Sequence, residues 1–198
     1  DRVMISFTDN TRATPNERII PWLLEALGDH PRDQIVLINQ LGTHRPNTRA
    51  ELEEMLTPEV VADYEVINHD CENDTELVTV GEMNDGTAAT VNRRVVEADL
   101  RIVTGFIEPH FFAGFSGGPK GIIPGCAGLE TIQASHNVHN IGHPQASFGI
   151  TDGNPLWEEL LRVALSIGPS FLVYVSLIHD RRITEVYTGD LREAHRRG

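Results

Sequence analysis

The sequence predicts an α/β protein with a mostly parallel central sheet flanked by helices, in a Rossmann-like three-layer arrangement. Short apolar runs alternate along the chain with segments that carry helix-capping residues, which is the order expected when helices connect parallel strands. The 198 residues are enough for one domain with a substantial core. No internal repeat or low-complexity linker divides the chain, so we treat residues 1–198 as a single domain.

Strands are predicted where a short apolar run is bounded by turn residues. These runs cover residues 3–8, 34–39, 64–68, 100–107, 171–178 and 183–187. The stretch 72–89 is polar, and Asn84-Asp85-Gly86 marks a turn within it.

Helices are predicted from their end signals. Thr14–Glu17 and Thr48–Glu51 each have the T-x-x-E spacing of a capping box, in which the two side chains satisfy free backbone N–H groups. Asn154-Pro155 begins the strongest helix, and Gly168 ends it. The predicted helices are 14–28, 48–56, a short one from residue 57, 91–98 and 155–167.

Composition excludes several classes of function. A net charge of −13 leaves no basic stripe for nucleic acid, and an anionic membrane surface is equally disfavoured. Apolar runs such as Phe171–Ile178 fall far short of the roughly 20 residues that cross a bilayer. Cys71 and Cys126 are far apart and form no C-x-x-C pair, which argues against a disulfide scaffold or a cysteine zinc site. With no secretory signal at the first residue, a cytoplasmic location is expected.

Polar segments follow three of the predicted strands. They are Asp9–Arg12, Gly42–Pro46 and Glu108–His110. In open α/β sheets ligands bind beyond the carboxyl ends of the strands. We therefore expect these segments to share one rim of the sheet.

The segment from Gly105 to Gly128 is rich in glycine. It holds seven of the 17 glycines, and it also holds Lys120, the only lysine among 16 cationic residues. Dense glycine lets backbone N–H groups approach a ligand, often a phosphate. Three of its phenylalanines, Phe111, Phe112 and Phe115, either stack on a flat ring or plug the loop onto the core, and the sequence leaves both open.

The glycine-rich segment does not match a standard phosphate-binding motif. Lys120 follows a proline and precedes a glycine, unlike the lysine of a Walker loop. Gly114–Gly118 does match G-x-S-x-G, so Ser116 is a candidate hydrolase nucleophile. That motif needs an immediate strand, turn and helix, whereas prolines flank it here. A serine hydrolase is therefore kept as an alternative function.

Three histidines follow the glycine-rich segment, at positions 136, 139 and 143. On one continuous helix they would lie near one face, as metal ligands do. Gly142 and Pro144 interrupt such a helix, and backbone hydrogen bonding is the preferred interpretation for His139 and His143. Imidazole suits nickel, zinc and copper alike, so histidine alone does not select the metal.

The chain resembles the N-terminal domain of nickel-dependent lactate racemase and its family of 2-hydroxyacid racemases and epimerases. The matching pieces are DNTR at Asp9–Arg12, GTHRP at Gly42–Pro46, the block Glu108–Gly128 and SHN at Ser135–Asn137. They occur in the family's order and at close to its spacing. The long glycine-rich block is the specific part of the match.

The resemblance implies a nickel-pincer nucleotide, pyridinium-3,5-bisthiocarboxylic acid mononucleotide nickel, in which carbon and two sulfurs hold the metal. It implies a covalent thioamide tether on Lys120 and a metal bond from His136, completing a square-planar site of the kind nickel(II) prefers. We also expect Ser116, Gly117 and Gly118 to contact the cofactor. Cofactor-maturation proteins are the implied partners.

The resemblance further implies the residues that handle the substrate, a lactate-like 2-hydroxy acid. His44 and His110 act as acid and base on the hydroxyl, Arg12 holds the carboxylate and Asp9 lies beside it. A racemase needs a proton acceptor for each orientation of the hydroxyl, and two imidazoles meet that need. Hydride transfer to the pyridinium leaves a planar keto acid that can be reduced on either face.

The family has a second, C-terminal domain that closes over the cofactor and is absent from this chain. An isolated N-terminal domain is expected to be inactive, because its site stays wet and holds the substrate from one side. A cofactor-binding module without activity of its own is therefore a further alternative.

Overall fold

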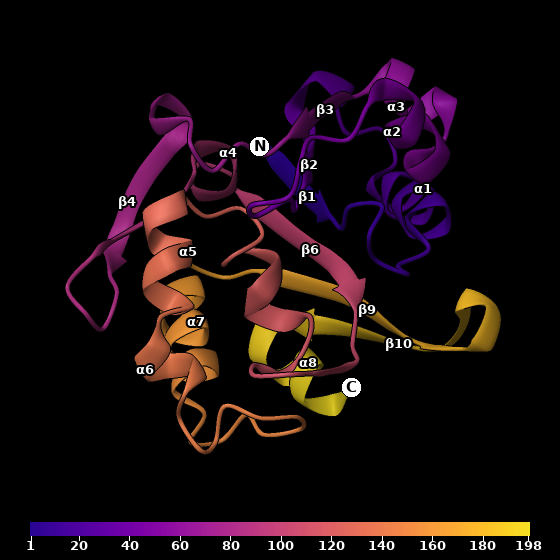
Figure 1. Cartoon of the computed structure of the whole chain (residues 1–198). Coiled ribbons are helices and arrows are strands. Elements are labelled where there is room, and N and C mark those ends of the chain that lie inside the picture. The colour runs from indigo at the N-terminus through magenta and orange to yellow at the C-terminus, as the bar shows by residue number, and fades with distance from the viewer.

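The computed structural model describes residues 1–198 and has the predicted α/β architecture (Figure 1). A six-stranded sheet has the order β10-β9-β6-β1-β2-β3, and only β10 runs antiparallel to its neighbour. Its strands are β1 (Val3–Phe7), β2 (Ile35–Asn39), β3 (Glu65–Asn68), β6 (Leu100–Phe106), β9 (Phe171–Ile178) and β10 (Arg182–Asp190). Every residue of β1 and β2 is buried, as expected of central parallel strands covered on both faces.

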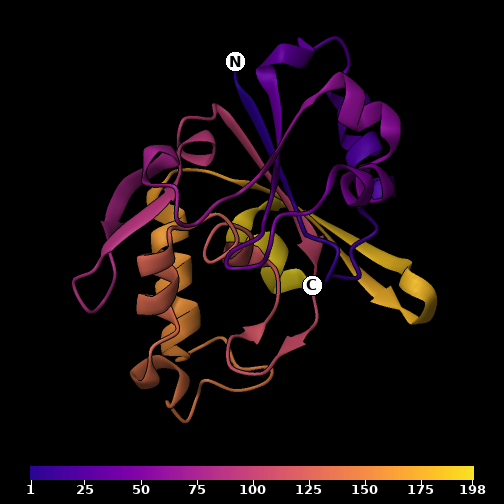
Figure 2. The same ribbon diagram turned by 45° about the horizontal axis from the view of Figure 1, so that its top comes forward.

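Helices cover both faces of the sheet, giving three layers (Figures 1 and 2). One face carries α1 (Asn16–Leu27), α2 (Arg49–Leu56) and α3 (Pro58–Asp63), which pack around Ile5 and Leu37. The other carries α7 (Pro155–Ser166) and α8 (Leu191–Arg197), which pack around Met4 and Tyr174. Shorter elements on that second side are α4 (Arg93–Val96), α5 (Leu129–Ser135) and α6 (Val138–Ile141). None of these helices is both long and apolar enough to cross a membrane.

Two of the predicted helix starts are confirmed by their caps. The Thr48 hydroxyl accepts the Glu51 N–H at 3.3 Å, and the Glu51 carboxylate accepts the Thr48 N–H at 2.7 Å. The Asn154 side chain accepts the N–H groups of Leu156 and Trp157 at the start of α7. These helix starts need only local contacts, so the sequence pattern was sufficient to find them.

The capping box predicted at Thr14 is wrong. The helix begins at Asn16, and the buried Thr14 hydroxyl has no hydrogen-bond partner. Tertiary contacts set the chain path instead: Asn16 donates to the Thr8 carbonyl at 2.8 Å, and Arg181 donates to the Thr14 carbonyl at 2.8 Å. Residues far along the chain thereby override the local signal.

The polar stretch 72–89 forms a strand pair that the sequence pattern did not show. Strands β4 (Leu77–Glu82) and β5 (Ala88–Asn92) pair antiparallel on either side of the predicted turn. Half of the residues of β4 are exposed and none is fully buried. Such a strand does not require a continuous apolar run, which is the signal by which the other strands were predicted. The pairing also takes residues 91 and 92 into β5, which shortens the helix predicted over 91–98 to α4.

Candidate functional site

A cavity of about 420 Å³ lies at the carboxyl edge of the sheet. It brings together the predicted site residues that follow β1, β2 and β6 with the glycine-rich segment and the end of α5. The predicted residues in its lining are Asp9, Arg12, His44, His110, Ser116, Gly117, Lys120 and His136. The expectation that these segments share one rim is confirmed.

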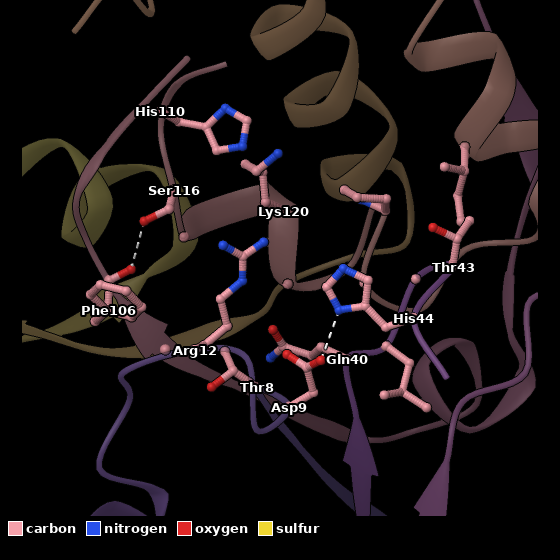
Figure 3. Close-up of a pocket in the computed structure, with 18 of the residues that line it drawn as sticks. Thr8, Asp9, Arg12, Gln40, Thr43, His44, Phe106, His110, Ser116 and Lys120 are labelled. Atoms are coloured by element: carbon pink, nitrogen blue, oxygen red, sulfur yellow. Dashed lines mark hydrogen bonds and ion pairs between the residues drawn. The ribbon is translucent and has the colours of Figure 1, made fainter. Parts of the chain in front are cut away.

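Asp9 and His44 form a hydrogen-bonded pair across the ends of β1 and β2 (Figure 3). The His44 Nδ1 lies 2.7 Å from the Asp9 Oδ2, and Asp9 is only 3% exposed. An ionised carboxylate can only accept, so Nδ1 carries a proton that it donates to Asp9. In neutral His44 this leaves the lone pair on Nε2, where it is free to accept a proton.

Arg12 lies on the loop after β1 and is exposed. Asp9 pairs with His44 rather than with Arg12, whose guanidinium makes no hydrogen bond or ion pair within the chain. Figure 3 shows that guanidinium directed toward Lys120. Arg12 is therefore free to bind an anion with its planar fork of N–H groups.

Lys120 lies in the short 3-10 helix Gly118–Gly121. Its ammonium group has no hydrogen bond or ion pair, and burial, together with the charge of Arg12, lowers its pKa to about 8. A cation held in a partly desolvated place without a counter-ion is unfavourable unless a ligand occupies the site. The position therefore suits an anionic ligand or a reaction of the neutral amine.

His110 lies in β7 (Pro109–His110), which pairs with β8 (Gly114–Phe115). Its Nδ1 accepts the Ala113 backbone N–H at 3.3 Å, so the neutral ring carries its proton on Nε2. Burial lowers its pKa to about 4, and the charges of Lys120 and Arg12 add to the effect. At neutral pH His110 is therefore uncharged and carries an Nε2–H that it can donate to a ligand.

His136 ends helix α5, and hydrogen bonds fix its tautomer. Its Nδ1 lies 3.2 Å from the Ile132 carbonyl, which can only accept, and 2.8 Å from the Ser135 hydroxyl, which donates to that same carbonyl. Nδ1 therefore carries the proton, and Nε2 keeps a lone pair for a ligand. Burial and the charge of Lys120 lower the pKa of His136 to about 4.

The three histidines after the glycine-rich segment do not form one helical face. Helix α5 stops before His136, and a new helix, α6, contains His139. Only His136 lines the cavity. The interruption expected near Gly142 and Pro144 corresponds to the end of α6 at Ile141, whereas the break between α5 and α6 was not predicted.

Three phenylalanines of the glycine-rich segment, Phe111, Phe112 and Phe115, have three different environments. Phe112 lines the cavity, with its ring edge-on to His110 at 4.8 Å and to His136 at 5.6 Å between centroids. Phe111 is 75% exposed and contacts the ring of Phe148. Phe115 lines a separate cavity beside α7 and α8. Of these three, only Phe112 lines the main cavity, where it joins Phe106 of the same segment.

Ser116 has a structural hydrogen-bond pattern that does not favour the hydrolase alternative. Its hydroxyl donates to the Phe106 carbonyl at 3.0 Å and accepts the Glu108 N–H at 3.0 Å. No histidine contacts the hydroxyl, because the His195 Nε2 bonds the Ser116 backbone carbonyl instead. The G-x-S-x-G match is therefore not accompanied by a base.

The two glycines after Ser116 face different sides of the loop. Gly117 lines the cavity, whereas Gly118 lies against Trp157 and His195, where a Cβ atom would come within 3.1 Å and 2.8 Å of their rings. Gly118 is not part of the cavity lining, and the expected contact of its backbone with a cofactor stays a prediction. Its role is to let the loop pass close to α7 and α8.

Two residues of the cavity floor escaped the sequence analysis. Gln40 and Tyr174 both line the cavity. Gln40 follows β2 and belongs to the carboxyl edge, a position that could have identified it. Tyr174 lies within the apolar run of β9, where it is indistinguishable in sequence from a core residue.

The fold and site define an α/β protein with a ligand cavity at the carboxyl edge of its sheet. Comparison with known proteins places it in a family: residues 1–149 match the lactate racemase N-terminal domain. The chain belongs to this family.

Two lactate racemases are similar over nearly the whole chain. The enzyme of Lactiplantibacillus plantarum is 35% identical over 197 residues, and that of Thermoanaerobacterium thermosaccharolyticum is 31% identical over 197 residues. Each alignment covers 99% of this chain and 46% of the relative. The chain thus spans about half the length of the curated relatives it matches.

Solved structures agree with this assignment. The lactate racemase apoprotein from Thermoanaerobacterium thermosaccharolyticum superposes with a TM-score of 0.95 at 31% identity, covering 100% of this chain and 48% of that one. A protein from Thermotoga maritima gives a TM-score of 0.81 at 24% identity over 100% of this chain and 53% of its own. The second match supports the fold alone.

Proposed function

We propose that this chain supplies the acid/base, substrate-binding and cofactor-binding residues of an enzyme that racemises or epimerises a lactate-like 2-hydroxy acid. The observation that carries the proposal is the cavity, where three imidazoles, a free guanidinium and an unpaired lysine line the same space (Figure 3). The names of the similar proteins support lactate as the type of substrate.

Arg12 and the two histidines are suited to a 2-hydroxy acid. The free fork of Arg12 binds a carboxylate through two parallel hydrogen bonds. His44 can take the hydroxyl proton on Nε2, because Asp9 holds its Nδ1–H and stabilises the imidazolium that forms. His110 offers an Nε2–H to the substrate oxygen. Two imidazoles from different loops allow the hydroxyl to be met in either orientation.

The chain's own residues fit a nickel-pincer nucleotide. The Lys120 amine is unpaired and has a lowered pKa, which suits a covalent tether, and the His136 Nε2 keeps a lone pair for a metal. No cluster of three or more histidine, cysteine or acidic side chains could hold a metal by itself. A single protein ligand suits a metal held mainly by its cofactor.

In this proposal Lys120 carries the nucleotide, His136 binds its nickel, and Ser116 and Gly117 lie beside it. When bound, the group supplies an acceptor for the C2 hydrogen of the substrate as hydride and returns it to either face of the planar keto acid. Phe112 narrows the space between His110 and His136 and excludes water from it.

The covalent tether is tested on the only lysine of the chain. A lysine-specific protease should split denatured apo-protein into two fragments after Lys120. Protein produced with cofactor-maturation proteins and nickel should resist this cleavage, because acylation removes the charge that the protease recognises. Its intact mass should rise, with the added mass on the peptide that contains Lys120.

The matched control is Lys120→Arg. It keeps a positive charge at the same place but should lose the adduct, since a guanidinium is a poor nucleophile. If matured protein is cut as readily as apo-protein and gains no mass, the tether is wrong. The glycine-rich loop would then be an ordinary anion site with Lys120 as its point charge.

A further inference from the structure

The hydroxyl of Tyr174 is a polar group at the cavity floor with no partner in the chain. Tyr174 lies in β9 beside Gly105 of β6 and is 1% exposed. Its hydroxyl makes no hydrogen bond within the chain, although buried tyrosine hydroxyls usually find a partner. Burial raises the pKa of Tyr174, so the hydroxyl stays protonated and can both donate and accept.

Three glycines make room for this side chain. A Cβ atom at Gly105 or Gly117 would lie 2.6 Å or 2.5 Å from the Tyr174 ring, and one at Gly121 would lie 3.0 Å from its hydroxyl. The ring therefore occupies a slot that residues with side chains would close. In this slot the hydroxyl lies next to Gly121, in the turn that carries Lys120, and Tyr174 lines the floor of the cavity.

Gln40 adds a second unpartnered group at the same place. Its Nε2 donates to the Ser6 hydroxyl at 2.8 Å and to the Thr104 carbonyl at 3.0 Å. The Thr104 carbonyl can only accept, so the nitrogen must face it and the Gln40 Oε1 must point elsewhere. That oxygen makes no hydrogen bond within the chain, and Gln40 lines the cavity. A Cβ at Gly121 would lie 3.2 Å from the Gln40 Nε2 and 3.0 Å from the Tyr174 hydroxyl, so both side chains approach the same glycine.

The chemistry of this pair selects its ligand. An amide oxygen binds only a donor, whereas a tyrosine hydroxyl binds a donor or an acceptor. A phosphate or carboxylate oxygen would meet the Gln40 oxygen unfavourably. A hydroxyl satisfies both groups, because it donates to one and accepts from the other. The cations that suit an anion, Arg12 and Lys120, are separate residues of the same cavity.

We propose that Tyr174 and Gln40 bind a ribose hydroxyl of the nucleotide at the floor of the cavity. The inference rests on the proposed function, which places a mononucleotide in this cavity. It assigns two ligand-binding residues and the part of the ligand that they recognise.

The test compares Tyr174→Phe with the wild-type chain, using nicotinate mononucleotide and its 2′,3′-dideoxy analogue as probes. The substitution removes one oxygen atom. We expect it to weaken binding of the ribonucleotide roughly five-fold, the effect of one neutral hydrogen bond. Binding of the dideoxy analogue should be weaker than that of the ribonucleotide and unaffected by the substitution. Calorimetry or the ligand-induced shift in Tm measures both.

The control is Tyr187→Phe. Tyr187 donates its hydroxyl to Glu185 outside the cavity, so its loss should leave both affinities unchanged. Without ligand, Tyr174→Phe should keep the wild-type Tm, because its hydroxyl makes no bond in the apo-protein. A fall of more than about 5 °C would show a structural hydrogen bond and overturn the inference.

The remaining outcomes separate this inference from the proposed function. If the wild type binds the ribonucleotide and Tyr174→Phe binds it equally well, the inference fails and the proposed function stands. If the substitution weakens both probes by the same factor, the Tyr174 hydroxyl does not recognise the ribose. If the wild type binds no mononucleotide, the proposed cofactor class fails, and the inference fails with it.

Discussion

The two walls of the cavity differ in how their charges are balanced. The first wall consists of Asp9, Arg12 and His44, on loops after β1 and β2. The second consists of His110, Lys120 and His136, from the glycine-rich segment and the end of α5. The first contains a carboxylate hydrogen-bonded to an imidazole, whereas the second contains no carboxylate.

This difference separates a preorganised pair, Asp9 and His44, from buried groups that await a ligand. Asp9 fixes the tautomer and orientation of His44 before any substrate arrives. In the second wall, burial lowers the pKa of all three groups, and none has an anionic partner. Such an arrangement costs stability in the empty protein and gains it when an anion or metal binds. Substitutions in one wall should therefore act differently from substitutions in the other.

The largest effect is expected at Asp9. Asp9→Asn replaces an acceptor by an amide that can donate to the His44 Nδ1, which favours the tautomer with the proton on Nε2. By analogy with buried aspartates that orient a catalytic histidine, we expect kcat to fall by on the order of 10³–10⁴ in an active racemase. Nitrogen chemical shifts of His44 should show the tautomer change independently of activity.

A matched control removes a different contact of the same carboxylate. The Thr11 hydroxyl donates to the Asp9 Oδ1 at 2.8 Å. Thr11→Val keeps the charge and the His44 contact, so kcat should fall far less. If Asp9→Asn retains both the His44 tautomer and the activity, the first wall is not preorganised in the way proposed.

The second prediction concerns metal binding by the second wall. His136→Gln removes the free Nε2 and should lower the nickel retained by matured protein at least ten-fold. The adduct mass on Lys120 should remain, which distinguishes loss of metal from loss of nucleotide. His139→Gln makes the same change on an exposed residue of α6 and should leave the nickel content unchanged. Equal nickel in both variants would exclude His136 as the ligand.

The third prediction uses the reactivity of Lys120 in apo-protein. Because its pKa is lowered to about 8, its acylation rate should rise with pH around a midpoint near 8, against about 10.4 for an unfolded lysine. At pH 7 the neutral amine is then on the order of 100-fold more abundant than in an ordinary lysine. Peptide mass spectrometry follows the rate at this single site.

Arg12→Gln tests whether the first wall contributes to that shift. The charge of Arg12 is the second cause of the lowered pKa of Lys120, after burial. Its removal should move the midpoint upward by less than the whole shift. A midpoint near 10 in the folded wild-type protein would instead show a solvated lysine that is not prepared for a tether.

Local chemistry made much of this fold predictable. The parallel strands appear as continuous apolar runs, and the caps at Thr48 and Asn154 involve residues only two or three positions apart. The segments after β1, β2 and β6 were placed together by topology alone. Sequence reasoning therefore located the cavity before its geometry was known.

The parts that sequence reasoning missed depend on distant contacts. Tyr174 becomes a floor residue only because glycines from two other segments meet its ring. Gly118 faces away from the cavity because Trp157 and His195 approach from helices that follow it in the chain. Hydrogen bonding assigns Ser116 a structural role, which the G-x-S-x-G pattern cannot show. These roles follow from tertiary packing and not from local spacing.

The smallest expected effect is the acid sensitivity that His110 gives to the apo-protein. Its pKa is about 4 in the folded chain and about 6.5 when unfolded. Between these values the unfolded chain binds a proton that the folded chain does not, so the free energy of unfolding falls as pH drops from 6.5 to 4. One such group contributes at most about 1.4 kcal/mol per pH unit. Solvent access to the half-buried ring reduces the contribution below this limit.

His110→Gln should make the stability profile shallower in that window, because glutamine does not titrate. Urea unfolding at several pH values between 4 and 7 measures the slope. His139→Gln should leave the slope unchanged, since that ring is exposed. Nicotinate mononucleotide should stabilise the wild type in this range if its anionic group offsets the unpaired cations of the second wall. If the free energy of unfolding depends on pH equally in the wild type and in His110→Gln, the pKa of His110 is not lowered by burial in the folded chain.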